Sequence, residues 1–166
     1  RQRLLFEAGY GKAFWQYDLR TQEISRVYEN IGSEPFDPPF FSPDGRLFAF
    51  GSLICRETEN DRVCNQVMDL YDASTGELIR RIPENGLNEW EDMDVYAFSP
   101  DSQLVATGGD DDVVRVWEVA SGTLKYKLPH ESDVQSLSFS PDGSVLVSAG
   151  LDATVRFWDM QSGKSL

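Results

Sequence analysis

Three residue types that could perform hydrolysis lie close together near the end of the chain. His130, Ser148 and Asp152 are the base, nucleophile and acid types of a serine hydrolase triad, and His130 is the only histidine present. Ser148, however, stands inside an apolar run typical of a strand, without the sharp turn that exposes a nucleophile, and no oxyanion site is evident. The pattern favours a structural role for these residues, and we expect no enzyme.

The two cysteines of the chain form a second candidate. If Glu59 and Asn60 make a two-residue turn, Cys55 faces Cys64 across a hairpin. Directly opposed cysteines can reach disulfide distance at a non-hydrogen-bonded pair. One interpretation is therefore a disulfide that acts as a staple or as a redox switch. The other is that both cysteines are reduced, as in a cytosolic protein. The second is favoured because disulfides are rare in the cytosol.

A third candidate is the run Asp110-Asp111-Asp112. Its hard oxygen ligands would suit calcium, but the glycine and distal glutamate of a calcium-binding EF-hand loop are missing. A turn between two strands explains the run better. Two cysteines with no nearby histidine do not make a zinc site either, so we expect no metal and no cofactor.

The elements that must position these residues are short strands. From His130 to Gly163, three apolar runs are separated by Ser-Pro-Asp-Gly, Gly-Leu-Asp and Gln-Ser-Gly segments. Proline, aspartate and glycine in such segments each favour turns, by a fixed φ, a local hydrogen bond and positive φ respectively. The pattern predicts a meander of antiparallel strands.

This block is repeated along the chain. Phe98-Ser-Pro-Asp101 returns 41 residues later as Phe139-Ser-Pro-Asp142, and Trp117-Glu118 returns at the same offset as Trp158-Asp159. Earlier aromatic-acid pairs begin at Tyr17 and Tyr71. A period of about 40 to 45 residues is that of four-stranded propeller blades.

These residues resemble the WD-repeat (WD40) β-propeller family over nearly the whole chain. The resemblance implies an all-β fold of four-stranded antiparallel blades, here about three and a half to four of them in an incomplete ring. The expected divisions are a partial, degenerate first blade at 1–37, a second at 38–82 with an extended hairpin insertion at 52–68, a third at 83–128 with an acidic entry loop, and a fourth at 129–166 with a truncated outer strand.

The resemblance also implies a structural tetrad in place of a catalytic site. In WD repeats, Trp158, Ser148, His130 and Asp152 would form a buried hydrogen-bonded chain. The third blade keeps a partial set, Thr107, Asp111 and Trp117, and has Glu89 where the histidine would align.

The net charge of −13 is expected to lie mainly on one face. Loops that share one face in the family hold most of the acids, and among the cations only Arg56 and Arg62. A one-sided negative field favours basic partners and excludes nucleic acid; the alternative is solvated loops that keep the protein soluble. The acids around Trp90 resemble an aromatic anchor with a charged rim. The candidate partner-binding residues are Glu89, Trp90, Glu91, Asp92, Asp94, Asp110, Asp111 and Asp112.

The chain therefore predicts a non-enzymatic interaction, scaffold or sensor module with a protein partner, possibly Lys/Arg-rich. No apolar run is long enough for a membrane span and no signal peptide opens the chain, so a cytoplasmic location without membrane contact is expected. Both ends fall within strand patterns, which indicates part of a longer protein. The remaining blades or a second copy would cover the apolar faces of the terminal blades. Self-assembly of two half-rings is the alternative function, and a propeller-type hydrolase is less favoured.

Overall fold

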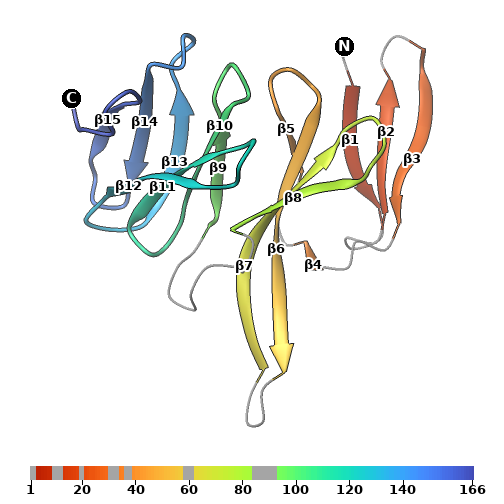
Figure 1. Cartoon of the computed structure of the whole chain (residues 1–166), viewed down its shortest axis with the longest axis horizontal. Coiled ribbons are helices and arrows are strands. Elements are labelled where there is room, and N and C mark those ends of the chain that lie inside the picture. The colour runs from red at the N-terminus through yellow and green to blue at the C-terminus, as the bar shows by residue number, and fades with distance from the viewer. Residues whose placement is uncertain are drawn as a thin grey trace.

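The structure, a computed structural model, describes residues 3–8, 13–18, 21–29, 34–35, 39–57, 62–83 and 93–166. Within these ranges the chain forms strands and no helix. The strands build antiparallel sheets that follow one another across the molecule in chain order (Figure 1). In that part of the chain, no segment is a helix long and apolar enough to cross a membrane.

The first two sheets occupy the N-terminal half. The first comprises β1 (Arg3–Ala8), β2 (Ala13–Asp18) and β3 (Glu23–Glu29). The second comprises β5 (Phe40–Phe41), β6 (Leu47–Glu57), β7 (Arg62–Asp72) and β8 (Leu78–Ile82). A short strand, β4 (Glu34–Pro35), also pairs with β6, although the prolines near it favour a loop.

The last two sheets repeat the meander. The third comprises β9 (Val95–Phe98), β10 (Leu104–Gly108), β11 (Val113–Glu118) and β12 (Leu124–Pro129). The fourth comprises β13 (Val134–Phe139), β14 (Val145–Gly150) and β15 (Val155–Asp159). The outer strand stub expected at 164–166 is reduced to one bridge between Trp158 and Ser165.

Each Ser-Pro-Asp turn closes with the same hydrogen bonds. In the fourth sheet the Ser140 hydroxyl donates to Asp142 at 2.6 Å and accepts the backbone N–H of Val145 at 3.0 Å. Serine-to-aspartate bonds of 2.6 Å recur in the two preceding sheets, at Ser42–Asp44 and Ser99–Asp101. The turn therefore fixes the start of the second strand in three successive sheets.

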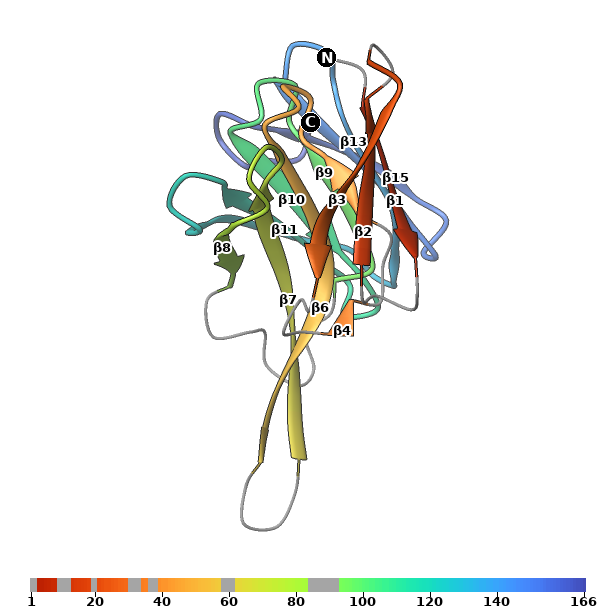
Figure 2. The ribbon, with the colours of Figure 1, turned by 90° about the vertical axis from the view of Figure 1, so that its right-hand side faces the viewer.

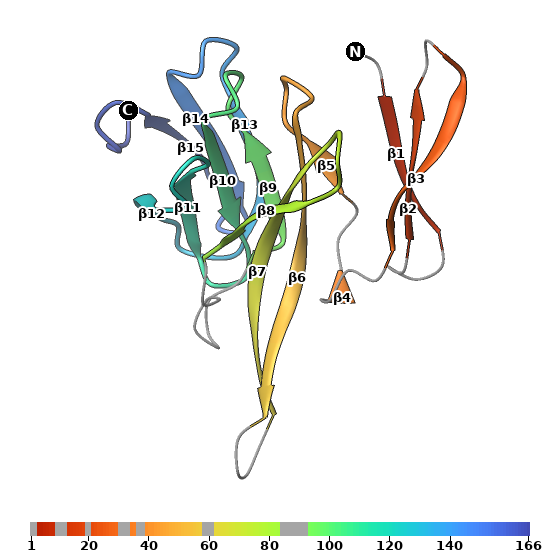
Figure 3. The same cartoon turned by 45° about the vertical axis from the view of Figure 1, so that its right-hand side comes forward.

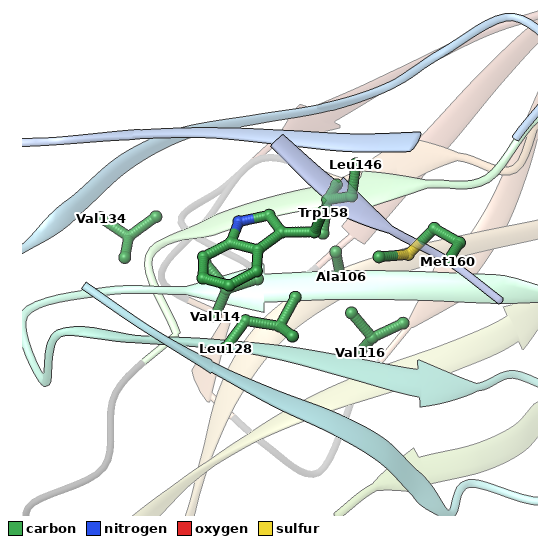
Figure 4. Packing of buried hydrophobic residues seen from close by; sticks show 8 residues of the cluster. All are labelled: Ala106, Val114, Val116, Leu128, Val134, Leu146, Trp158 and Met160. Atoms are coloured by element: carbon green, nitrogen blue, oxygen red, sulfur yellow. The ribbon is translucent and has the colours of Figure 1, made fainter. Parts of the chain in front are cut away.

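The core lies between neighbouring sheets. Trp117 packs with residues of the second and third sheets, including Met68, Ile82 and Met93. Trp158 packs between the third and fourth sheets, against residues contributed by both (Figure 4). The residues of this second cluster are Ala106, Val114, Val116, Leu128, Val134, Leu146, Trp158 and Met160. Because β11 contributes to both clusters, it is apolar on both faces, as a strand buried on both sides requires.

The outer strands of the second and third sheets also reach over the next sheet. The Arg80 guanidinium of β8 donates to the carbonyl of Ser121 at 3.0 Å and lies against Gly122. One sheet further, Tyr126 of β12 lies against Gly163 and donates its hydroxyl to the carbonyl of Gln161 at 2.9 Å. Both glycines have positive φ in equivalent turns. The same contact thus joins the second sheet to the third and the third to the fourth.

The outer face of the fourth sheet is apolar and exposed. Val155 is 58% exposed and Phe157 is 49% exposed on β15, and Leu166 is exposed beside them. These side chains alternate with Trp158 and Arg156, which point to the buried side. This is the uncovered face that the sequence predicts for a terminal blade; the side chains of the first sheet are largely outside the described residues.

The hairpin of β6 and β7 extends well beyond its sheet. Its pairing runs without interruption from Leu47–Asp72 to Glu57–Arg62, whereas β8 pairs with β7 only as far as Met68. Figures 2 and 3 show the outer part as a two-stranded ribbon that projects away from the sheets. We call residues 54–57 and 62–66 the arm. The insertion expected at 52–68 forms the outer part of this hairpin.

Candidate functional site

The tetrad residues of the fourth sheet are in hydrogen-bonded contact. The Trp158 indole N–H donates to Ser148 Oγ at 2.8 Å, and Ser148 Oγ lies 2.6 Å from His130 Nε2. His130 Nδ1 lies 3.2 Å from an oxygen of Asp152. β14 and β15 supply Ser148 and Trp158, while His130 and Asp152 come from the loops before β13 and after β14.

The donor and acceptor groups determine the direction of the hydrogen bonds in this network. A carboxylate only accepts, so in a neutral imidazole Nδ1 of His130 carries the proton donated to Asp152, and Nε2 is then the acceptor for the hydroxyl of Ser148. Ser148 in turn accepts from Trp158. Its hydroxyl is thus satisfied, and Ser148 is fully buried. A buried and satisfied serine cannot meet a substrate, which supports the structural role over the catalytic one.

Asp152 has further partners. It accepts from the Thr154 hydroxyl at 2.7 Å, from the Glu131 backbone N–H at 3.2 Å, and forms an ion pair with Arg156 at 3.2 Å. These hydrogen bonds, that from Thr154 first, hold the pKa of Asp152 well below its usual range. Asp152 therefore stays ionised and ties the loop before β13 to the loop after β14.

The third sheet has a shorter network of the same kind. Trp117 donates its indole N–H to Thr107 at 3.1 Å. Asp111 forms a 2.6 Å ion pair with Arg115, and both side chains are nearly completely buried. Glu89, which aligns with His130, lies outside the described residues. The Asp–Arg pair at a spacing of four is repeated in the fourth sheet as Asp152 and Arg156, so its recurrence at 41 residues is a sequence signal for a buried aspartate.

The second sheet replaces the polar chain with aromatic rings. Phe50 stands at the position of Thr107 and Ser148, and its ring stacks on Tyr71, which also stacks on Phe48. Burial raises the pKa of Tyr71 above its usual value. Nearby, the fully buried Asp69 accepts two bonds from Arg81, at 2.6 and 2.9 Å. The second sheet is thus packed through stacked rings at positions that the third and fourth sheets fill with tetrad residues.

The arm contains a disulfide. Cys55 and Cys64 are directly opposed in the β6–β7 register, with Cα atoms 4.0 Å apart, and their sulfurs are bonded. The favoured expectation of two reduced cysteines is therefore corrected. It rested on the rarity of disulfides in the cytosol, whereas the decisive factor is the hairpin register, which places the two side chains on the same face with their sulfurs within reach of each other. The cytoplasmic location stays a prediction.

The acids of the loops divide into two groups. Exposed carboxylates belong to Asp94, Asp110 and Glu131, the last with its side chain 84% exposed. Backbone hydrogen bonds keep this group together: the Asp94 N–H donates to Gly108, and the His130 N–H donates to Asp112. We call Asp94, Asp110, Asp112 and Glu131 the acidic face. Its residues lie in the loops that enter β9, join β10 to β11 and follow β12, and the sheet register places these loops at one end of the third sheet.

Asp111 does not belong to that surface. Its side chain is 8% exposed and is bound to Arg115, so its expected part in partner binding is corrected to an internal one. The other predicted partner-binding residues, Glu89, Trp90, Glu91 and Asp92, lie outside the described residues. Within the ranges that the structure describes, no group of three or more histidine, cysteine or acidic side chains is arranged to hold a metal ion.

Comparison with known proteins agrees with this architecture. The family profile described as "WD domain, G-beta repeat" (WD40) matches residues 91–118 and 122–159. Each match ends at an aromatic-acid pair, Trp117-Glu118 or Trp158-Asp159. A 32-residue segment is 59% identical to "Periodic tryptophan protein 2" of Arabidopsis thaliana, but it is only 19% of this chain and 4% of that protein.

Solved structures show the same fold. The crystal structure of RRP9 WD40 repeats and the structure of U3-55K each superpose on 77% of the chain with a TM-score of 0.63 and 18% identity. The chain spans 36% and 37% of those two chains, just over a third of their length. The profile matches identify two WD40 repeats within residues 91–159, and the sheet topology and the solved structures show that the chain has the fold of part of a WD40-type β-propeller.

Proposed function

We propose that the chain is a non-enzymatic interaction module, and that its acidic face binds a Lys/Arg-rich segment of a protein partner. Proteins of this architecture typically act as interaction scaffolds, with loops held on a rigid array of sheets. The observation that carries the proposal is the separation of the acids by exposure: the Asp111 and Asp152 side chains are nearly buried in ion pairs, whereas Asp94, Asp110 and Glu131 are exposed, Glu131 within 3.6 Å of Arg156.

The charge balance supports a basic partner. Arg115 is paired with the nearly buried Asp111, whereas Arg156 is shared between Asp152 at 3.2 Å and Glu131 at 3.6 Å. Arg156 therefore offsets part of the charge at Glu131, but no ion pair of Asp110 is found among the described residues. The overall charge of −13 adds to the negative field of this surface. Such a surface steers cations toward it and repels nucleic acid phosphates, with a strength that falls as salt rises.

The test measures binding of a fluorescent Lys/Arg-rich peptide to the whole chain by anisotropy. Asp110→Lys and Glu131→Lys should each weaken binding on the order of fivefold at low salt, since they remove an attraction and add a repulsion. The matched control is Glu77→Lys, the same charge change in an exposed turn at the opposite end of the second sheet. It should have a much smaller effect.

Two outcomes would overturn the proposal. If Glu77→Lys weakens binding as much as Asp110→Lys, the peptide responds to net charge and has no defined site. If the peptide binds no more tightly than an acidic peptide of equal length, the surface is a solvated face. Raising salt should weaken binding of the unmodified chain more than that of Asp110→Lys.

A second candidate function is packing of the fourth sheet on another blade or another copy of the chain. The exposed apolar side chains of Val155, Phe157 and Leu166 favour it. Light scattering after size exclusion tests self-assembly: a dimer that Phe157→Arg converts to a monomer would support it. A monomer at all concentrations would exclude the second copy as the covering element.

A further inference from the structure

We propose that the Cys55–Cys64 disulfide is a reversible thiol–disulfide exchange site whose redox state controls the acidic face through a hydrogen bond between Gln66 and Met93. Its effect on a basic partner rests on the function proposed above. The exchange reaction and the coupling to Met93 rest on the geometry of the arm alone.

The disulfide lies where the sheet no longer supports the strands. On one edge, β4 pairs with β6 at Leu53; on the other, β8 pairs with β7 no further than Met68. Beyond these points the arm is a two-stranded ribbon, which is marginally stable in water by itself. The Cys55–Cys64 bond is the covalent link between its strands, so its state decides whether the arm stays paired.

The disulfide is accessible to a reductant. Cys55 is exposed, whereas Cys64 is half-buried. A thiolate of a dithiol would attack the Cys55 sulfur, forming a mixed disulfide and releasing the Cys64 thiolate, which takes up a proton. The second thiol of the reductant then attacks the mixed disulfide and releases Cys55. The products are two protein thiols and the oxidised, disulfide form of the reductant, so two electrons pass from the dithiol to the protein.

Gln66 connects the arm to the acidic face. It follows Cys64 by two residues on the same strand and therefore lies on the same side of the ribbon. Its side-chain oxygen accepts the backbone N–H of Met93 at 2.7 Å. Met93 is fully buried between the second and third sheets, and the next residue, Asp94, belongs to the acidic face.

Reduction should act along this path. Without the cross-link, the paired ends of β6 and β7 separate more often, and Gln66, which pairs with Leu53 at the base of the arm, is held less firmly at its position. The Met93 N–H then loses its acceptor more often, and the segment that leads into Asp94 is held less firmly. A surface that must be ordered on binding has a lower affinity than one already in place. The oxidised protein is therefore the binding-competent state.

Hydrogen exchange measured by mass spectrometry on the whole chain tests both the exchange reaction at the disulfide and its coupling to Met93. Dithiothreitol should reduce the Cys55–Cys64 bond and accelerate exchange in the arm, and in the segment containing Met93, on the order of fivefold or more. Cys55→Ser/Cys64→Ser should show the faster exchange with or without dithiothreitol. The amides of the Ser140–Val145 turn, which is remote from the arm, should exchange at the same rate with and without dithiothreitol, in the unmodified chain and in the variant.

The variant Gln66→Leu separates the coupling from the disulfide. It keeps the size of the side chain and removes the acceptor, so its arm should still respond to dithiothreitol while the Met93 segment no longer does. If that segment responds equally in Gln66→Leu, the proposed path is wrong. If dithiothreitol in excess leaves the bond intact under native conditions, the site is a permanent staple and the exchange proposal is wrong.

Binding of the Lys/Arg-rich peptide completes the test. Affinity on the order of fivefold higher in the oxidised chain than in the reduced chain, with no such difference in Gln66→Leu, supports control of the acidic face. Equal affinity in both redox states overturns that control. Absence of binding in both states overturns the proposed function, while the hydrogen-exchange result still decides the thiol switch.

Discussion

The indole nitrogen of Trp158 lies 2.8 Å from the hydroxyl of Ser148, and the same pair of positions, 41 residues earlier, holds Trp117 and Thr107 at 3.1 Å. Among the residues that the structure describes, only the Trp158–Ser148 pair is extended by further hydrogen bonds to a histidine and an aspartate. The two sheets therefore offer an internal comparison of a complete polar network with a shorter one.

We expect Trp158→Phe to destabilise the fourth sheet by about 1–3 kcal/mol, because Ser148 loses a buried donor and the chain to His130 is left incomplete. Trp117→Phe removes the same atoms from the shorter network and should cost less. The measurement is urea unfolding of both variants, followed by circular dichroism. Equal losses in the two variants would mean that the histidine and aspartate add nothing.

The ion pair of Asp111 and Arg115 predicts a large difference between neighbouring aspartates. Asp111→Ala leaves a buried guanidinium without its nearest carboxylate and should cost about 3 kcal/mol. Asp110→Ala removes an exposed carboxylate next to it and should change stability by less than about 0.5 kcal/mol. Thermal unfolding of the two variants measures this difference in stability. A small loss for Asp111→Ala would contradict its internal role.

The contact between Tyr126 and Gly163 predicts intolerance of any side chain at that glycine. A Cβ at Gly163 would meet ring carbons of Tyr126 at 2.5 Å, at a φ of +69°. Gly45 has nearly the same φ, +68°, with nothing within 4 Å of the added atom. Gly45→Ala should therefore cost only the conformational term of about 1–2 kcal/mol. Gly163→Ala should cost at least about 1 kcal/mol more because of the overlap.

Those two glycine variants should be compared by urea unfolding at one temperature. If they lose the same stability, Tyr126 moves aside at no cost, and its contact with the fourth sheet is weak. Tyr126→Ala combined with Gly163→Ala provides the complementary check, since the penalty from the overlap should disappear in the double variant.

Asp142 predicts a pH dependence at the acid end. Hydrogen bonds from Ser140 and Ser144 lower the pKa of Asp142 from 3.8 to about 2. Because the folded pKa lies below the unfolded one, this carboxylate stabilises the fold above about pH 4, and the contribution is lost as the pH falls through about 2. The urea midpoints of wild type and Asp142→Asn should differ at pH 5 and converge toward pH 2. A constant difference would contradict the assignment.

The repeating features of the fold could be predicted from the sequence because they recur at a fixed spacing. The Ser-Pro-Asp turns and the aromatic-acid pairs give the sheet order and the position of the core tryptophans, since both depend on local turn chemistry and on strand periodicity. The WD-repeat resemblance then places Trp158, Ser148, His130 and Asp152 on neighbouring loops and strands.

What could not be predicted depends on contacts between elements that the repeat does not specify. Asp111 resembles its exposed neighbours in sequence, and only the burial of Arg115 separates it from them. The pairing of β4 with β6 brings together residues about 18 positions apart through a segment rich in proline. The register of the hairpin predicts the disulfide, because it opposes Cys55 and Cys64; the rarity of disulfides in the cytosol predicts the reduced form and says nothing of this geometry.

The contacts of Arg80 and Tyr126 give the array of sheets a direction. The second and third sheets each reach forward over a glycine turn of the next sheet, so the third sheet has one side that covers a turn and another side whose turn is covered. If the third sheet were deleted as a unit, Arg80 would meet Gly163, a turn equivalent to the Gly122 turn that it now covers. Gain or loss of a whole sheet therefore preserves a contact between a long side chain and a glycine turn. If the third sheet were turned around instead, Gly122 would face Gly163, and neither Arg80 nor Tyr126 would have a glycine turn to cover.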